Sequence, residues 1–201
     1  EEAALEVRLL LQESFSLNTA GYLLRKQELL CKADREKVEA AGIEQTEILG
    51  KLHSFFENFE KRRRRIPLAQ ILGRQSFYGL DFFVNEDVLI PRADTECLVD
   101  LVLEDYAEKR ILDLCTGSGC IGISVAKHLP YQELLLVDLS EKALAMAKKN
   151  AEKHLGENVT LLQSDLLTGV QGKKFSLLLS NPPYIVSRVI PGLDREVSEY
   201  E

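Results

Sequence analysis

The sequence predicts an α/β protein: a Rossmann-like core with a parallel sheet, preceded by a small all-α domain and a linking β-hairpin. Three observations predict it. The first 72 residues carry helical periodicity, residues 77–84 are aromatic-rich and strand-like, and apolar segments alternate with helical ones after residue 110. Apolar strands separated by helices form parallel βαβ units, which bind ligands at the carboxyl ends of their strands. We therefore expect a helical domain at 1–72, the hairpin at 73–90 and the ligand-binding core at 91–201.

The N-terminal region is expected to form three helices. Ala3–Gln12 and Ala20–Leu30 are the first two, and Gly42 marks a turn before the third. The third helix carries an apolar stripe at helical spacing, formed by Ile48, Leu49, Leu52, Phe55, Phe56 and Phe59. A run of cations at 61–65 follows, and cations stabilise the negative end of a helix dipole. Contact of this run with RNA is the alternative, and the capping role is favoured.

In the core, strands and helices are expected to alternate after the Phe77–Val84 hairpin and a helix at Thr95–Tyr106. The expected strands are Arg110–Leu114, Glu133–Val137, Val159–Gln163 and Phe175–Ser180, and the helices between them are Cys120–His128 and Glu141–His154.

Composition excludes several classes of protein. Asp and Glu number 32 against 25 Lys and Arg, and the resulting charge of −7 disfavours binding to a nucleic-acid backbone. Four cysteines show no C-x-x-C spacing and three histidines are scattered, which indicates a reducing cytoplasm, no disulfide framework and no metal. No apolar run approaches the roughly 20 residues that span a bilayer, so we expect no membrane partner.

The strongest local motif follows the first core strand. Residues 117–122 fit G-x-G-x-x-G, whose glycines permit a tight turn and let a ligand approach the backbone at a helix N-terminus. Asp138 ends the next strand about 20 residues later, where a carboxylate can accept both hydroxyls of a ribose. Together they predict an adenosine cofactor. A glycine-rich turn needed only for helix packing is the alternative.

Asp113 separates two adenosine cofactors. A carboxylate at the mouth of the loop would repel a pyrophosphate and attract the ammonium group of a methionine moiety, so Asp113 favours S-adenosylmethionine over NAD. Cys115 is interpreted as a small packing residue, because no cation stands beside it to activate a thiolate.

A second motif, Asn181-Pro182-Pro183-Tyr184, follows the last apolar strand. Two prolines fix the backbone and remove two N–H donors, which leaves a rigid turn rich in acceptors. The side-chain carbonyl of Asn181 and the backbone carbonyl of Pro182 can each accept one N–H of a planar –NH2 group, while Tyr184 lies against its flat face. Holding both protons aims the nitrogen lone pair at a sulfonium methyl group, and no dedicated base is required. A bare turn is the alternative.

At this point the chain resembles the HemK/PrmC family of protein-glutamine N5-methyltransferases. The residues that carry the resemblance are Asp113–Gly119, Asp138, Asn181–Tyr184 and Ile90–Glu96, together with the helical N-terminal unit. The resemblance implies a class I methyltransferase core that uses S-adenosylmethionine, releases S-adenosylhomocysteine and methylates the glutamine of the Gly-Gly-Gln motif in peptide chain release factors. This reaction belongs to translation termination, in the cytoplasm.

The resemblance also assigns roles by position. It implies cofactor contacts from Cys115, Thr116, Gly117, Ser118, Gly119 and Asp138, from Asp165 and Leu166 beside the adenine, and from Asn181. Asn181, Pro182, Pro183 and Tyr184 would form the glutamine pocket, with Asn181, Pro182 and Tyr184 as the catalytic set. The helical domain is expected to dock the protein substrate, since a small cofactor domain does not need it.

The sequence departs from the family in three places. Cys115 stands where relatives often have glycine, and Leu166 where some have an aromatic residue, so apolar packing would replace stacking on the adenine. The family fold has seven strands and the sequence accounts for four, so we expect a core that is incomplete at its C-terminus. Two other functions stay open: methylation of adenine N6 in nucleic acid, and a module that binds NAD(H) or another nucleotide without methyl transfer.

Overall fold

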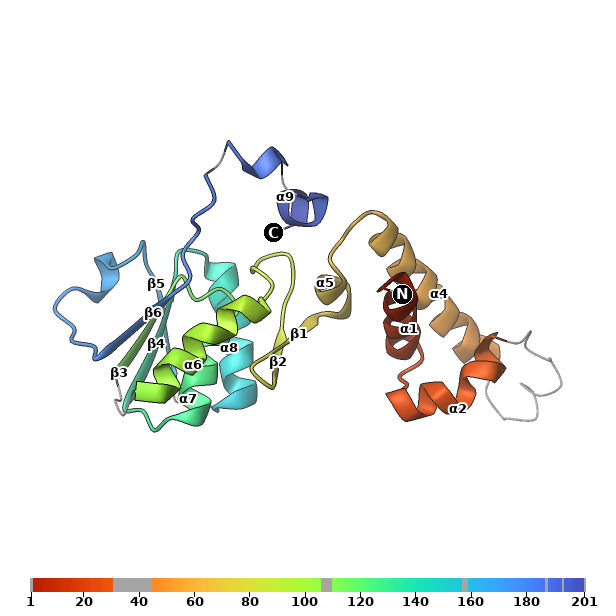
Figure 1. Cartoon of the computed structure of the whole chain (residues 1–201), viewed down its shortest axis with the longest axis horizontal. Coiled ribbons are helices and arrows are strands. Elements are labelled where there is room, and N and C mark those ends of the chain that lie inside the picture. Colours follow the sequence, from red (N-terminus) through yellow and green to blue (C-terminus); the bar gives the residue numbers. More distant parts are fainter. Residues whose placement is uncertain are drawn as a thin grey trace. The chain divides into compact units, whose positions relative to one another are not determined.

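The computed structural model of the chain describes residues 2–30, 45–105, 110–156, 159–186, 188–192 and 194–200. Two compact units make up the chain, Glu1–Leu72 and Gly73–Glu201. Figure 1 shows the helices of the first unit and the mixed helices and strands of the second.

The first unit is helical. Its described helices are α1 (Glu2–Ser14), α2 (Thr19–Leu30), α4 (Gln45–Arg63) and α5 (Leu68–Leu72). α1 packs against both α4 and α5, and Leu10 of α1 is fully buried. The apolar stripe on α4 is confirmed as part of one helix, although Leu49 and Phe56 remain 63% and 61% exposed. The turn expected at Gly42 lies outside the described residues.

The second unit begins with the predicted hairpin, which is confirmed, although its first strand starts at Arg74, before the range Phe77–Val84 expected for it. Strands β1 (Arg74–Phe77) and β2 (Leu80–Phe83) pair antiparallel through a two-residue turn. Both turn residues, Tyr78 and Gly79, have positive φ (49° and 72°), which matches the twist of the flanking strands. Phe77 and Phe82 point into the core and are 1% and 0% exposed, so the hairpin is packed on the core.

Four parallel strands form the core sheet, in the order β5-β4-β3-β6. They are β3 (Arg110–Leu114), β4 (Glu133–Asp138), β5 (Thr160–Gln163) and β6 (Leu177–Ser180). The helices of this unit are α6 (Glu96–Asp105), α7 (Cys120–His128), α8 (Glu141–His154) and α9 (Arg195–Tyr200), with short 3-10 turns at Ala93–Thr95, Thr168–Val170 and Ile190–Gly192. The α/β fold and its alternation are confirmed, and the strand starts expected at Val159 and Phe175 lie one and two residues later.

Side chains along each strand alternate between the two faces of the sheet, so the sheet has a hydrophobic cluster on each face. Ile111 of β3 packs with apolar residues of α6, α7 and α8, whereas Leu112 and Leu114 pack with Val170 on the opposite face. Figure 1 shows α6, α7 and α8 together on one side of the sheet. Successive residues of a strand point to opposite faces, so odd-numbered residues of β3 face the helices.

Candidate cofactor and substrate site

The two predicted motifs begin side by side at the carboxyl edge of the sheet. In the register, Leu114 of β3 lies opposite Ser180 of β6 on one side and Val137 of β4 on the other. The next residues are Cys115, Asn181 and Asp138, so the structure brings the glycine loop, the Asn-Pro-Pro-Tyr turn and Asp138 to one edge. Strands that end in register present their following loops to one ligand.

The glycine loop closes as a tight turn before α7. The Gly119 N–H donates to Thr116 O at 2.8 Å, and the Thr116 N–H donates to Val137 O of β4 at 3.0 Å. Gly117 and Gly119 have φ values of +54° and +82°, which glycine adopts without steric cost. Cys115 shares this left-handed region at φ +57°, which is uncommon for a residue with a side chain.

Asp138 ties this loop to the end of β4. Its Oδ2 accepts from the Gly117 N–H at 2.8 Å and its Oδ1 accepts from the Ser140 N–H at 3.0 Å. A carboxylate has about four acceptor positions, so both oxygens keep capacity for further hydrogen bonds. Asp138 is half-buried and thus able to meet a ligand. The remaining acceptor positions of the carboxylate therefore fit the two hydroxyls of a ribose, which would donate to it.

Asp113 lies beneath the loop, and its predicted position at the mouth of the loop is wrong. It is 1% exposed, and its Oδ2 accepts from Thr116 Oγ1 at 2.7 Å and from the Gly122 N–H at 3.0 Å. The cause is strand alternation, which turns residue 113 toward the helices as it does Ile111. Burial raises the pKa of Asp113 to about 6, while the hydrogen bonds from Thr116 and Gly122 oppose that rise. Asp113 therefore supports the loop from below.

Residues after β5 supply apolar surface at the same edge. Leu166 is 54% exposed with φ +48°, and its carbonyl accepts from Ser164 Oγ at 3.1 Å. Leu139, directly after Asp138, is 66% exposed, and Asp165 is exposed as well. These exposed leucine side chains lie near Asp138, the candidate acceptor for a ribose. They offer an apolar surface suited to the flat faces of an adenine.

The Asn-Pro-Pro-Tyr turn is held at its root and open at its tip. Ser180 Oγ donates to Leu114 O at 2.9 Å and so anchors the end of β6 to β3. Asn181 is half-buried, Pro182 and Pro183 are exposed, and Tyr184 is 79% exposed. The turn thus presents its acceptors and an aromatic ring beside the glycine loop.

The thiols of this region are poor nucleophiles. Burial raises the pKa of Cys115, and the carboxylate of Asp138 adds to that rise. Burial raises the pKa of Cys120 to about 12. A nucleophilic cysteine requires a lowered pKa, so the interpretation of Cys115 as a packing residue fits its surroundings.

Asn150 of α8 is a site residue that the sequence analysis missed. It is fully buried, and its Nδ2 donates to Ser118 O in the glycine loop at 2.8 Å. The signal was available, because Asn150 follows Ala143 and Ala147 at helical spacing on the buried face of α8. A polar residue in such a stripe indicates a specific hydrogen-bonding role.

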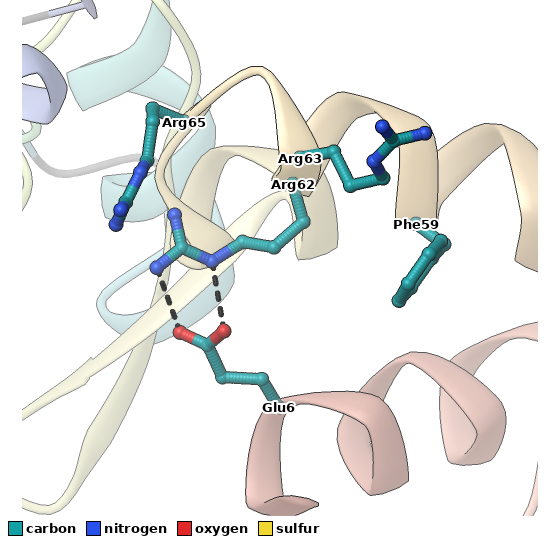
Figure 2. A pocket seen from close by; sticks show the side chains of 5 residues that line it. All are labelled: Glu6, Phe59, Arg62, Arg63 and Arg65. Carbon is teal, nitrogen blue, oxygen red and sulfur yellow. Dashed lines mark hydrogen bonds and ion pairs between the residues drawn. The ribbon is translucent and has the colours of Figure 1, made fainter. Parts of the chain in front are cut away.

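In the helical unit, the cation run closes α4. Lys61, Arg62 and Arg63 lie in the last turn of the helix, as the capping interpretation requires. Figure 2 shows Arg62 making two hydrogen bonds to Glu6 of α1, with Nη2–Oε1 at 2.8 Å and Nε–Oε2 at 3.0 Å. This paired geometry joins α1 to α4, so Arg62 has a structural role within the unit.

No group of three or more His, Cys, Asp or Glu side chains among the described residues could hold a metal ion. None of the helices that the structure describes is both long and apolar enough to cross a bilayer.

Comparison with known proteins relates the chain to methyltransferases. Residues 93–191 match the family model of the methyltransferase small domain, which covers α6, the glycine loop and the Asn-Pro-Pro-Tyr turn. The fold and site therefore define a methyltransferase domain. Among solved structures, the Pyrococcus abyssi tRNA (uracil-54, C5)-methyltransferase with S-adenosyl-L-homocysteine matches with a TM-score of 0.47 and 24% identity, over 61% of this chain and 31% of that chain.

Curated relatives narrow the class. The release factor glutamine methyltransferase of Thermodesulfovibrio yellowstonii is 36% identical over 92% of this chain and 69% of its own length. Those of Moorella thermoacetica and Geobacter sulfurreducens are 39% and 44% identical over 98% and 70% of this chain. The chain belongs to the release factor glutamine methyltransferase family. It spans 65% and 50% of the length of the latter two relatives.

Proposed function

We propose that this protein transfers the methyl group of S-adenosylmethionine to the side-chain amide nitrogen of the glutamine in the Gly-Gly-Gln motif of a peptide chain release factor. One observation carries the proposal: the turn that begins at Asn181 starts beside the glycine loop, because Ser180 and Leu114 are paired in the sheet. An amide group held by the turn at Asn181 would therefore lie next to a cofactor held by the glycine loop. A release factor substrate also agrees with the cytoplasmic location that the cysteine usage predicts.

For the cofactor, Asp138 would accept the ribose hydroxyls, and the backbone of Cys115–Gly119 would face the methionine portion. Leu139 and Leu166 would pack on the adenine in place of an aromatic residue, consistent with their exposure of 66% and 54%. When bound, S-adenosylmethionine supplies an electrophilic methyl carbon on a positively charged sulfur.

For the substrate, the side-chain carbonyl of Asn181 would accept one N–H of the glutamine amide and the backbone carbonyl of Pro182 the other. Tyr184 would lie against the flat amide. The prolines keep these acceptors rigid, so the nitrogen lone pair points at the methyl carbon and the amide enters the reaction already aligned. As the N–C bond forms, the S–C electron pair stays on sulfur, and the methylated nitrogen loses one proton to water.

A methyl-transfer assay tests the function. Purified protein and S-adenosylmethionine with a radiolabelled methyl group would be incubated with a release factor, with the same factor carrying Gly-Gly-Asn, and with DNA. We expect label on the unaltered factor alone, and mass spectrometry should place the methyl group on the glutamine. Label on DNA but not on the factor would instead support the adenine-N6 alternative.

Cofactor choice has its own test. Asp113 is buried and no longer argues against a pyrophosphate, so the choice of cofactor rests on the family to which the chain belongs. Titration calorimetry should detect binding of S-adenosylmethionine and no binding of NAD. The reverse result would support a dinucleotide-binding module and end the proposal.

We also propose that the helical unit docks the release factor. Its helix α4 exposes 63% of Leu49 and 61% of Phe56, apolar surface of the kind that partners cover. The variant Phe56→Ser should raise the KM for the folded factor by about tenfold and leave methylation of a short Gly-Gly-Gln peptide unchanged. Equal effects on both substrates would contradict docking by this face.

A further inference from the structure

Asn150 makes three hydrogen bonds from a fully buried position on α8. Its Nδ2 donates to Phe83 O at 3.0 Å and to Ser118 O at 2.8 Å, while its Oδ1 accepts from the Phe83 N–H at 2.7 Å. Both donors and the acceptor of the amide are thereby used. One side chain joins strand β2 of the hairpin to the glycine loop.

On the hairpin side, the Asn150 amide bonds the backbone N–H and carbonyl of a β2 residue, as a neighbouring strand would. Phe83 lies opposite Arg74 in the β1–β2 pair, and both its N–H and its carbonyl bond to the amide. Two residues earlier, the Asp81 carbonyl accepts from Lys153 Nζ at 2.5 Å, also from α8. Residues at positions i and i+2 of a strand face the same way, so α8 pairs with the outer edge of β2.

On the loop side, Asn150 fixes a peptide plane. The Ser118 carbonyl and the Gly119 N–H belong to one planar unit, so the orientation of one sets that of the other. The carbonyl accepts from Asn150, and the N–H closes the turn on Thr116 O at 2.8 Å. Ser118 is 2% exposed, so loss of the amide would leave a buried carbonyl without its donor.

We propose that Asn150 is a positioning residue for the cofactor loop, which it fixes through the Ser118 carbonyl and links to the hairpin that follows the helical unit. The effect on S-adenosylmethionine rests on the proposed function, because it takes that molecule as the ligand of the loop. The effect on the loop itself does not.

The test compares Asn150→Ala with Met146→Ala, which truncates an apolar side chain, 8% exposed, on the same helix. Without ligand, hydrogen exchange of the amides at residues 116–119 should become about tenfold faster in Asn150→Ala and stay within about twofold in Met146→Ala. By calorimetry, the Kd for S-adenosylmethionine should rise about tenfold in the first variant alone.

Equal exchange and equal Kd values in the two variants would overturn the proposal, because Asn150 would then only stabilise the fold. If the unaltered protein does not bind S-adenosylmethionine, the proposed function fails and the exchange comparison still decides the role of Asn150. Should Asn150→Ala not fold, native-state exchange in urea decides with the unaltered protein. The Phe83 and Gly119 amides should then exchange through one shared opening, and separate openings would overturn the proposal.

Discussion

The two loops at the carboxyl edge of the core sheet differ in how they are held. The glycine loop is fixed from three directions, by Asp113 below, Asp138 at its side and Asn150 from α8. The turn at Asn181 is anchored at its root through Ser180, and its tip carries a Tyr184 that is 79% exposed. A small cofactor needs a preformed cradle, whereas a protein substrate brings its own surface to complete a site. Anchoring and exposure thus separate the two proposed tasks.

The largest expected effect is on kcat, and it should separate the turn at Asn181 from the glycine loop and Asp138. Asn181→Ala should lower kcat about 100- to 1000-fold, because the amide loses one of its two acceptors, and leave the Kd for S-adenosylmethionine nearly unchanged. Asp138→Ala should do the opposite and mainly weaken cofactor binding. Steady-state kinetics and calorimetry on both variants check this contrast. An unchanged kcat in Asn181→Ala would mean that the amide clamp is wrong.

A second test concerns the anchor below the glycine loop. The Asp113 pKa of about 6 in the folded protein exceeds the ordinary value of 3.8, so the folded state binds the extra proton between these pH values. The contribution of Asp113 to the free energy of unfolding is therefore greatest below about pH 4. It falls by up to about 3 kcal/mol as the pH rises to 6 and above.

Urea unfolding of the unaltered protein and of Asp113→Asn, from pH 4.5 to 7.5, measures how the contribution of Asp113 to the free energy of unfolding depends on pH. The free energy of unfolding of the unaltered protein should fall relative to that of Asp113→Asn across this range. A difference between them that does not vary with pH would contradict the burial of an ionisable Asp113.

Gly122→Ala tests how closely α7 must approach the loop anchor. A Cβ atom there would lie 2.8 Å from Asp113 Oδ2 and 3.0 Å from Leu136 Cδ2. Helix propensity favours alanine by about 1 kcal/mol, but this overpacking should dominate and lower the free energy of unfolding by about 1–3 kcal/mol.

Gly50→Ala on α4 is the matched control, because a Cβ atom at Gly50 meets no atom of the described residues within 4 Å. It should raise stability by up to about 1 kcal/mol. A Gly122→Ala variant as stable as the unaltered protein would show that the loop tolerates a displaced α7.

The smallest expected effect on stability belongs to the open loop. Tyr184→Ala removes a side chain that is 79% exposed, so the free energy of unfolding should change by less than about 0.5 kcal/mol. Activity on a Gly-Gly-Gln peptide should nonetheless fall about tenfold in kcat/KM, because the ring that covers the amide is lost. Thermal melts and peptide kinetics check both parts, and a large loss of stability would place Tyr184 in the packing of the fold.

Sequence reasoning located the strands because each is an apolar run between glycine or polar segments, and it located the loops because their glycines and prolines restrict the backbone. The position of Asp113 was wrong because the loop motif was given more weight than strand alternation, which sends residue 113 toward the helices. Asn150 was missed for a different reason. Its partners Phe83 and Ser118 are far from it in the chain and are set by tertiary packing, although its place in an apolar stripe was visible.

The register of the sheet also sets an order of assembly during synthesis of the chain. β3 pairs with β4 across 23 residues, as the Arg110–Glu133 contact shows, and with β6 across 66, as the Ser180–Leu114 contact shows. Local pairings form before distant ones, and a nascent chain is released from its N-terminus. The three side-chain anchors of the loop proposed to bind the cofactor, Asp113, Asp138 and Asn150, all precede residue 151. The turn proposed to bind the substrate takes its place only when β6 pairs with β3.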